Sequence, residues 1–291
     1  MGGLRRYFVN QSYFRDGIRS GKQAWVWGAL MSDGYVGPHY LNWTQKHLDC
    51  KWVAHIRKEL GSEHPIKFYC SDGAAYARLR PYSSELARDA RTILKCEPGR
   101  KSFDVLMPEG IEPSLLSELV RAIFEGDGCA GFSGPYPSLS FVSGSKELLT
   151  EIRSAIGEQV LNGSYSRTNI GARKSCWYLG YTRREEVNAI AAWMYPLMDQ
   201  ENRWAEHGYM IRKTDRLRLI KKITEPGAFS RAERQEFVDA HRLKEQKEAA
   251  DRLQYLTALS LKGTSFGEYD EYLGIDNFQI GFRPRKERSG K

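Results

Sequence analysis

Two short stretches of this chain have nearly the same pattern: residues 25–34 read WVWGALMSDG and residues 119–128 read LVRAIFEGDG. Each is an apolar run of helix length, and each ends in Asp-Gly, at Asp33 and Asp127. The two aspartates are 127 − 33 = 94 residues apart, so each copy has room for one compact unit. A carboxylate at a helix C-terminus is unfavourable by up to ~1 kcal/mol unless a cation compensates. Two such ends brought together therefore predict a metal site.

The residues after Asp33 predict one unit of strands and helices. In YLNWTQ, Leu41 and Trp43 point to one face, as in a half-buried strand. The next segment predicts a helix that ends at Gly61 and has an apolar stripe of Leu48, Trp52, Ile56 and Leu60. IKFY and YARLRPY then predict a hairpin around Ser71-Asp72-Gly73, and SSELARDARTIL predicts a helix capped by Ser83 or Ser84.

The second half repeats this order. CAGF and SLSFVS predict strands, with Leu139 and Phe141 facing inward, and KELLTEIRSAIG predicts a helix. Strands near SYSRT and CWYLGYT and a closing helix in EEVNAIAAWMY complete an αββαββα plan in each half. We therefore predict an α+β fold with repeats at 1–105 and 106–222, followed by a helical C-terminal extension at 223–291.

These motifs resemble those of the LAGLIDADG homing endonucleases, in the monomeric two-repeat form, over residues 20–222. The resemblance implies two helices packed side by side at a pseudo-twofold axis, beneath saddle-shaped antiparallel sheets. Gly28, Ala29, Ala122 and Gly126 would let the helix backbones approach closely. The alternative is two unrelated buried helices, each followed by an Asp-Gly turn.

The resemblance also implies a site that binds Mg²⁺ or Mn²⁺ and hydrolyses phosphodiesters. Asp33 and Asp127 would bind the metal, with the backbone carbonyls of Ser32 and Gly126 beside it. Gln45 corresponds to a residue of the water network, although the second half has Val142-Ser143-Gly144-Ser145 at the matching place. Lys101 and Lys213 resemble basic residues near the two centres, with solvated surface charge as the alternative for each.

One further carboxylate lies close to these motifs. Glu125 stands two residues before Asp127 and so points elsewhere on the helix, which predicts a peripheral position.

The outward strand faces are expected to contact base edges in the DNA major groove. Plain solvent exposure of a polar face is the alternative for each residue. The expected contacts are Tyr40, Asn42, Thr44, Lys67, Tyr69, Arg78 and Arg80 in the first half, and Ser138, Ser140, Ser166, Arg167, Tyr178 and Arg183 in the second. Since the halves differ, we expect a long, non-palindromic target.

Charge and composition agree with a nucleic-acid partner. The chain of 291 residues carries 44 Lys and Arg against 36 Asp and Glu, a net charge of +8. Its five cysteines form no CxxC pair, and no signal peptide or apolar run of membrane-span length is present, so we expect a soluble, intracellular protein. The six histidines show no nuclease-like spacing, and no phosphate-binding loop indicates ATP dependence.

Beyond residue 222 the sequence becomes charged and helical. Residues 263–291 resemble a helix-turn-helix that ends in basic Arg283, Arg285 and Lys286, with a helical tail packed on the core as the alternative.

Taken together, the sequence predicts a monomeric, site-specific, double-strand DNA endonuclease. The alternative is a non-cleaving nucleic-acid binder on the same scaffold, either an intron RNA maturase or a transcription regulator, because phosphate contacts would look the same in both.

Overall fold

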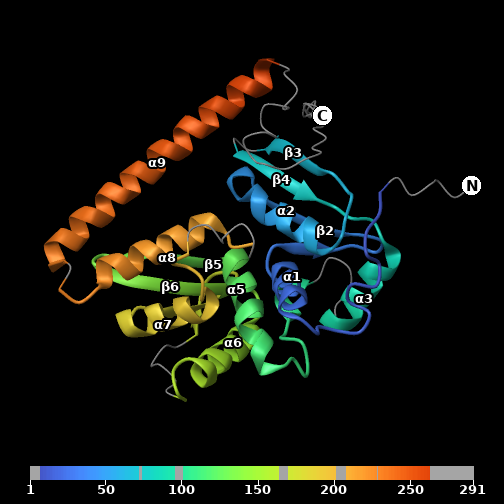
Figure 1. Cartoon of the computed structure of the whole chain (residues 1–291), viewed down its shortest axis with the longest axis horizontal. Coiled ribbons are helices and arrows are strands. Elements are labelled where there is room, and N and C mark those ends of the chain that lie inside the picture. The colour runs from blue at the N-terminus through green and yellow to red at the C-terminus, as the bar shows by residue number, and fades with distance from the viewer. Residues whose placement is uncertain are drawn as a thin grey trace, which may run out of the picture.

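The computed structural model describes residues 7–71, 74–95, 101–163, 170–200, 208–227 and 229–262. In it the chain forms two α+β repeats built around two four-stranded antiparallel sheets, followed by two further helices (Figure 1). The predicted fold class is confirmed. The division of the chain at residues 105 and 222 remains a prediction about domains.

The first repeat follows the order αββαββα. Its strands are arranged β1-β2-β4-β3, and every neighbouring pair is antiparallel. A one-turn 3-10 helix, His47–Asp49, precedes α2. The elements are α1 (Gly21–Met31), β1 (Gly34–Val36), β2 (Leu41–Lys46), α2 (Cys50–Glu59), β3 (Ile66–Ser71), β4 (Ala74–Leu79) and α3 (Ser84–Leu94).

The second repeat has the same order of elements and the same sheet topology, β5-β6-β8-β7. Between the repeats lie the short helix α4 (Lys101–Asp104) and a 3-10 turn, Pro113–Leu115. The elements are α5 (Leu116–Asp127), β5 (Gly128–Ser133), β6 (Tyr136–Ser143), α6 (Lys146–Gln159), β7 (Gly171–Ala172), β8 (Trp177–Tyr181) and α7 (Arg184–Met194). The duplication read from the sequence is therefore a duplication of structure.

Local sequence accounts for several element boundaries. The hydroxyl groups of Ser83 and Ser145 accept hydrogen bonds from backbone N–H groups three residues on, and so cap α3 and α6. Gly61 follows α2 with φ +54°, a conformation that glycine adopts without steric cost. Trp52, Ile56 and Leu60 are buried as the predicted stripe requires. Leu48 is exposed, because the 3-10 turn before α2 turns it away from that stripe, so its predicted burial was wrong.

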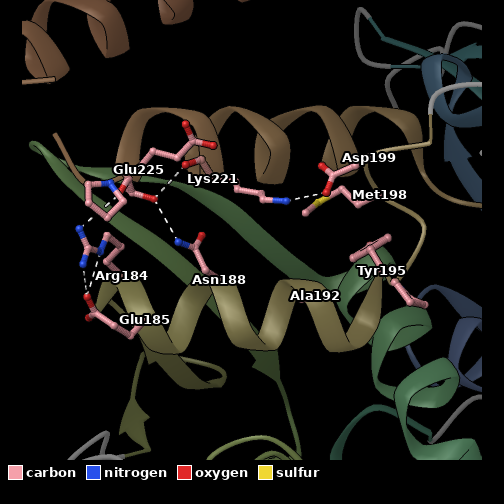
Figure 2. Close-up of a pocket in the computed structure, with 12 residues that line it drawn as sticks. Arg184, Glu185, Asn188, Ala192, Tyr195, Met198, Asp199, Lys221 and Glu225 are labelled. Atoms are coloured by element: carbon pink, nitrogen blue, oxygen red, sulfur yellow. Dashed lines mark hydrogen bonds and ion pairs between the residues drawn. The ribbon is translucent and has the colours of Figure 1, made fainter. Parts of the chain in front are cut away.

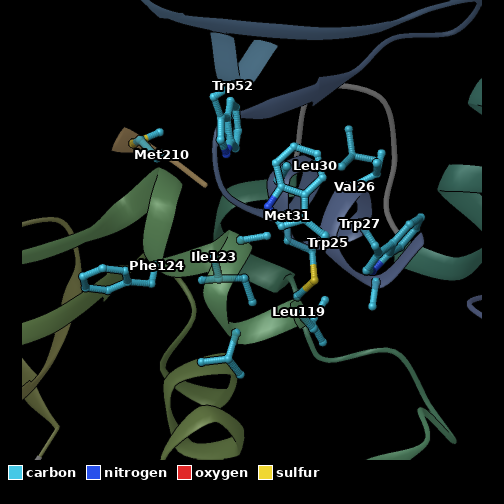
Figure 3. Close-up of a cluster of buried hydrophobic side chains, with 14 of the residues drawn as sticks. Trp25, Val26, Trp27, Leu30, Met31, Trp52, Leu119, Ile123, Phe124 and Met210 are labelled. Carbon is cyan, nitrogen blue, oxygen red and sulfur yellow. The ribbon is translucent and has the colours of Figure 1, made fainter. Parts of the chain in front are cut away.

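Helices α1 and α5 pack against each other at the centre of the molecule (Figure 1). A Cβ atom on Gly28 would collide with the Leu119 carbonyl oxygen and lie 2.8 Å from the Ala122 Cβ, so this approach requires glycine. Around the two helices, Trp25, Trp27 and Phe124 are fully buried (Figure 3). The small residues thus bring the helices together and the large ones fill the core around them.

Two helices follow the second repeat, α8 (Ile211–Thr224) and α9 (Arg231–Lys262). Helix α8 contacts β5 and α7 and buries Leu217 and Ile220. Thr224, in its last turn, receives a hydrogen bond from the Asn188 amide at 3.2 Å, so α8 is attached to the repeat through its final residue. Helix α9 contacts β4 of the first repeat.

Some predictions fall outside the described residues. These are the strand near residues 164–168, the hairpin turn at 72–73 and the helix-turn-helix at 263–291. In the described residues, β8 pairs with β6 on one side and with the short β7 on the other. In the part of the chain that the structure describes, no helix is long and apolar enough to cross a membrane.

Candidate nuclease centre at two helix ends

The predicted carboxylates lie at the adjacent ends of α1 and α5. Asp127 is the last residue of α5, and Asp33 follows α1 and its cap Ser32. A Cβ atom on Gly126 would lie 2.7 Å from Asp33 Oδ2 and would overlap the Ser32 hydroxyl, so the end of α5 directly touches the end of α1. The two helix ends meet because glycine leaves room for them.

Gln45 belongs to this meeting point. Its side-chain amide, at the end of β2, donates a hydrogen bond to Asp33 Oδ2. Strand β2 runs antiparallel to β1, which begins at Gly34 directly after Asp33, and this pairing brings residue 45 back to residue 33. The amide nitrogen fixes the orientation of the carboxylate without adding charge.

Lys213 supplies the cation that the end of α5 requires. Its ammonium group donates hydrogen bonds to the carbonyl oxygens of Phe124, of Gly126 at 3.3 Å and of Gly128 at 2.7 Å. Burial, helped by Arg212, lowers the pKa of Lys213 to about 8, although Asp33, Glu125 and Asp127 act in the opposite direction. The ammonium group is therefore protonated at neutral pH, and it partly balances both the helix dipole and the carboxylates.

Glu125 is not peripheral, and its predicted position was wrong. Its residue is only 1% exposed. Oε2 accepts hydrogen bonds from the indole N–H groups of Trp25 and Trp52, each at 2.8 Å. Oε1 accepts from the Arg121 guanidinium at 3.2 Å and from the Met210 backbone N–H at 3.1 Å. Glu125 points away from Asp127, as expected, but the direction it takes leads into the core, where α2 and the start of α8 supply its partners.

The buried ion pair between Arg121 and Glu125 balances the charge of the carboxylate in this hydrogen-bond network. Arg121 also pairs with Glu118, and its guanidinium lies 4.7 Å from the Tyr209 ring centroid. Burial by itself lowers the pKa of Arg121, but Glu125 and Glu118 outweigh burial and raise it, so the guanidinium stays charged. Sequence reasoning missed this network. The visible signal was an arginine and a glutamate at i and i+4 within residues 119–125, which are otherwise apolar.

Of the remaining predicted residues, Ser32 and Gly126 lie at the meeting of the helix ends, and Lys101 is only partly described. The Ser32 hydroxyl donates to the Gly28 carbonyl at 3.0 Å, and the Gly126 carbonyl is engaged by Lys213. Lys101 begins α4, and its side chain is outside the described residues. Within the described ranges, no three His, Cys, Asp or Glu side chains gather as a metal-holding group. Two carboxylates nevertheless suit Mg²⁺, which takes one or two carboxylates and keeps several waters.

The predicted DNA contacts divide into several groups. Asn42, Thr44, Lys67, Tyr69 and Arg78 lie on the outer face of the first sheet, with Tyr40 and Arg80 at its margin. Ser138, Ser140 and Tyr178 lie on the outer face of the second sheet, although Ser140 is only 5% exposed. Arg183 lies beyond β8 as the residue before α7, where it pairs with Glu186 at 3.6 Å. Ser166, Arg167, Arg283 and Arg285 are outside the described residues.

A recess of about 280 Å³ lies between α7 and α8, apart from these residues (Figure 2). Several of its polar groups bind one another: Lys221 pairs with Asp199, and Arg184 pairs with Glu185. None of its lining residues belongs to the predicted site. The recess therefore adds nothing to the centre.

Comparison with known proteins gives similarities of fold at low identity. No family model matches the chain, and no curated protein matches it. The homing endonuclease I-WcaI bound to its DNA recognition sequence is 13% identical, with TM-score 0.45, over 71% of this chain and 91% of that one. The N-terminal LAGLIDADG domain of DUF199/WhiA is 12% identical, with TM-score 0.42, over 66% of this chain and 94% of that one. Full-length DUF199/WhiA from Thermatoga maritima is 13% identical, with TM-score 0.44, over 91% and 90%.

Proposed function

We propose that this protein is a site-specific endonuclease that cuts both strands of a long, non-palindromic DNA target, as intron-borne homing enzymes do. The observation that carries the proposal is the meeting of Asp33 and Asp127 at two touching helix ends, with Gln45 and Lys213 bonded beside them. One chain carries both helix ends, so the protein would act as a monomer inside the cell.

The residues of this centre have separable roles. Asp33 and Asp127 would hold Mg²⁺ or Mn²⁺, which when bound supplies Lewis acidity and an activated water for phosphodiester hydrolysis. The Gln45 amide donates to one Asp33 oxygen and so fixes the orientation of the carboxylate. The Lys213 ammonium holds the last turn of α5 and adds positive charge next to Asp127.

Cleavage of duplexes selected from a randomised library tests the proposal. With Mg²⁺ the full chain should cut both strands of the selected duplex, and chelation should stop cleavage. Asp33→Asn and Asp127→Asn should each slow cutting by about two or more powers of ten, since metal assistance is worth several kcal/mol. Binding should change little, because these carboxylates hold no bases.

Asp16→Asn, which changes an exposed aspartate outside the centre, is the matched control and should cut at the normal rate. Cutting by Asp33→Asn or Asp127→Asn at the rate of the unchanged protein would disprove the proposal.

One observation favours a second candidate, a nucleic-acid binder that does not cleave. The Lys213 ammonium already occupies the carbonyls at the end of α5, including that of Gly126, so that helix end is stabilised by a cation of the chain itself. In that case the selected duplex, or an intron RNA, would be bound without Mg²⁺ and would remain intact when Mg²⁺ is added.

A further inference from the structure

The described strand residues on the outer faces of the two sheets differ in size and charge. On the first sheet, Lys46, Lys67 and Arg78 project from three different strands, and the strand register places Lys67 and Thr44 on either side of Arg78. Tyrosines fill the space between these cations. Among the described residues of the strands, this face carries no carboxylate.

The long side chains of this first face are held in place by one another. Tyr69 and Tyr76 stack at 5.5 Å between ring centroids, and the Arg78 guanidinium lies 5.2 Å from the Tyr69 ring. Arg80 lies 4.7 Å from the Tyr40 ring and donates to Asn42 Oδ1 at 3.3 Å. Guanidinium groups held in this way lose less side-chain entropy when they bind a base edge.

The strand residues on the matching face of the second sheet are small and neutral. The cation described on this face, Arg173, comes from the connection between β7 and β8, and its guanidinium lies 4.6 Å from the Tyr178 ring centroid. The described strand residues of this face include no charged side chain, and short residues occupy most positions that correspond to cations or tyrosines in the first sheet. Side chains this short cannot make the two-pronged contacts by which Arg, Asn and Gln distinguish base pairs. The outward residues are Cys129, Gly131, Ser133, Tyr136, Ser138, Ser140, Val142, Gly171, Tyr178 and Gly180.

The cations beside the β5–β6 turn come from α9. The Arg231 guanidinium lies 5.8 Å from the Tyr136 ring centroid, and Arg242 donates to the Phe132 carbonyl oxygen at 3.1 Å. Helix α9 thus starts at the tip of the β5–β6 hairpin, to one side of the sheet (Figure 1). Both guanidinium groups come from a helix outside the sheet, and Arg231 covers an outward tyrosine at the edge of its face, a position that suits phosphate contacts.

We propose that the protein reads base sequence with the sheet of the first repeat alone. It holds the other half of its duplex through sequence-independent phosphate contacts from cations outside the strands, which are Arg173 and, on α9, Arg231 and Arg242. This inference rests on the proposed binding of duplex DNA and is independent of cleavage. Its substrate is a duplex in which one half is specified and the other half is free to vary.

Selection of bound duplexes from a randomised library, with the full chain and no Mg²⁺, tests this division. Base preference should be confined to one contiguous half of the protected length. Arg78→Ala and Arg80→Ala should each remove preference at one or two positions in that half and weaken binding to the selected duplex by roughly 5- to 150-fold. Arg88→Ala, an exposed arginine on α3 away from this face, is the matched control and should change neither.

The double variant Arg231→Ala, Arg242→Ala should behave differently. It should weaken binding to selected and unselected duplexes by the same factor, and the salt dependence of log K should become shallower by about 0.9 for each phosphate that the variant no longer neutralises. Preference spread equally over both halves, or a library that shows no enrichment, would overturn the inference. A double variant that changes base preference would do so too.

The endonuclease proposal has a separate outcome in the same material. If base preference is confined to one half and the selected duplex stays intact when Mg²⁺ is added, this inference stands and the endonuclease proposal fails. A two-sided preference in a duplex that is cut gives the reverse outcome.

Discussion

The two helices that lead to the aspartates, α1 and α5, repeat in backbone and differ in electrostatics. Two residues before its aspartate, α1 has Met31, buried in the apolar core, where α5 has Glu125 with four hydrogen-bond donors around its carboxylate. A neutral amide, from Gln45, touches Asp33, and an ammonium group, from Lys213, closes the end of α5. The two repeats place their aspartates at matching helix ends but surround them with different chemical groups.

The largest effect is expected from making α5 resemble α1 at this position. Glu125→Met leaves Arg121 buried with only Glu118 as ion-pair partner, and leaves two indole N–H groups and the Met210 N–H unsatisfied. Removing one partner of a buried pair costs about 3–5 kcal/mol of unfolding free energy, measurable by urea denaturation.

Glu118→Met is the control for this substitution. Glu118 pairs with the same arginine, but its side chain is 30% exposed, against 0% for Glu125. A loss for Glu125→Met no larger than that of the control would mean that the difference between the two helices has no energetic weight.

The second prediction concerns how the unfolding free energy of the protein and of Lys213→Met depends on pH, measured with a chelator present and without DNA. The folded-state pKa of Lys213, about 8, lies below its ordinary value of 10.5, so between these pH values the unfolded chain binds more protons. Stability from this group therefore rises with pH across that window. Relative to Lys213→Met, the protein should gain up to about 3 kcal/mol between pH 8 and 10.5.

Burial also raises the pKa values of Cys50 and the buried tyrosines. These groups are present in the unchanged protein and in Lys213→Met, so their contributions cancel when the two unfolding free energies are subtracted. A difference that stays constant over the window would show that Lys213 titrates as an exposed lysine does.

A smaller effect is expected where the two helix ends touch. Gly126 corresponds to Ser32 of α1, and Gly126→Ala would place a methyl group 2.7 Å from Asp33 Oδ2. Overpacking of this kind typically costs about 1–3 kcal/mol, which thermal unfolding would show. Gly131→Ala has no atom within 4 Å of the added methyl group and should have no measurable cost beyond its strand context. Equal results for the two alanines would contradict the contact between the helix ends.

The smallest effect is expected at the end of α1, where the polar partner of the aspartate is the uncharged amide of Gln45. Gln45→Met removes one hydrogen bond to a partly buried carboxylate, so the unfolding free energy should fall by about 0.5–1.5 kcal/mol. Thr44→Val, at the neighbouring position on the opposite face of β2, serves as the control. If Gln45→Met costs as much as Glu125→Met, the two helix ends are equally dependent on their polar partners.

The fold could be predicted because its signals are local. The Asp-Gly ends, the alternation in β2 and β6 and the serine caps each lie within a few residues of what they determine. The pairing of Gln45 with Asp33 follows from a short antiparallel connection. The surroundings of Glu125 could not be predicted in this way, because its partners Trp25, Trp52 and Met210 are 100, 73 and 85 residues away. Which helix face enters the core depends on elements that periodicity in one segment does not identify.

The hydrogen bond between Met210 and Glu125 also constrains the order of assembly during synthesis on the ribosome. The first repeat contains all the strands of its own sheet and can pair them as soon as residue 79 has emerged. Glu125 has its full set of donors only after residue 210 has emerged, at the start of α8. Contacts of such long sequence separation form late, because the intervening loop must first be closed. A ribosome paused between the end of α5 and the start of α8 would therefore hold a finished first sheet beside a second repeat that still lacks the backbone N–H of Met210 and the ammonium group of Lys213.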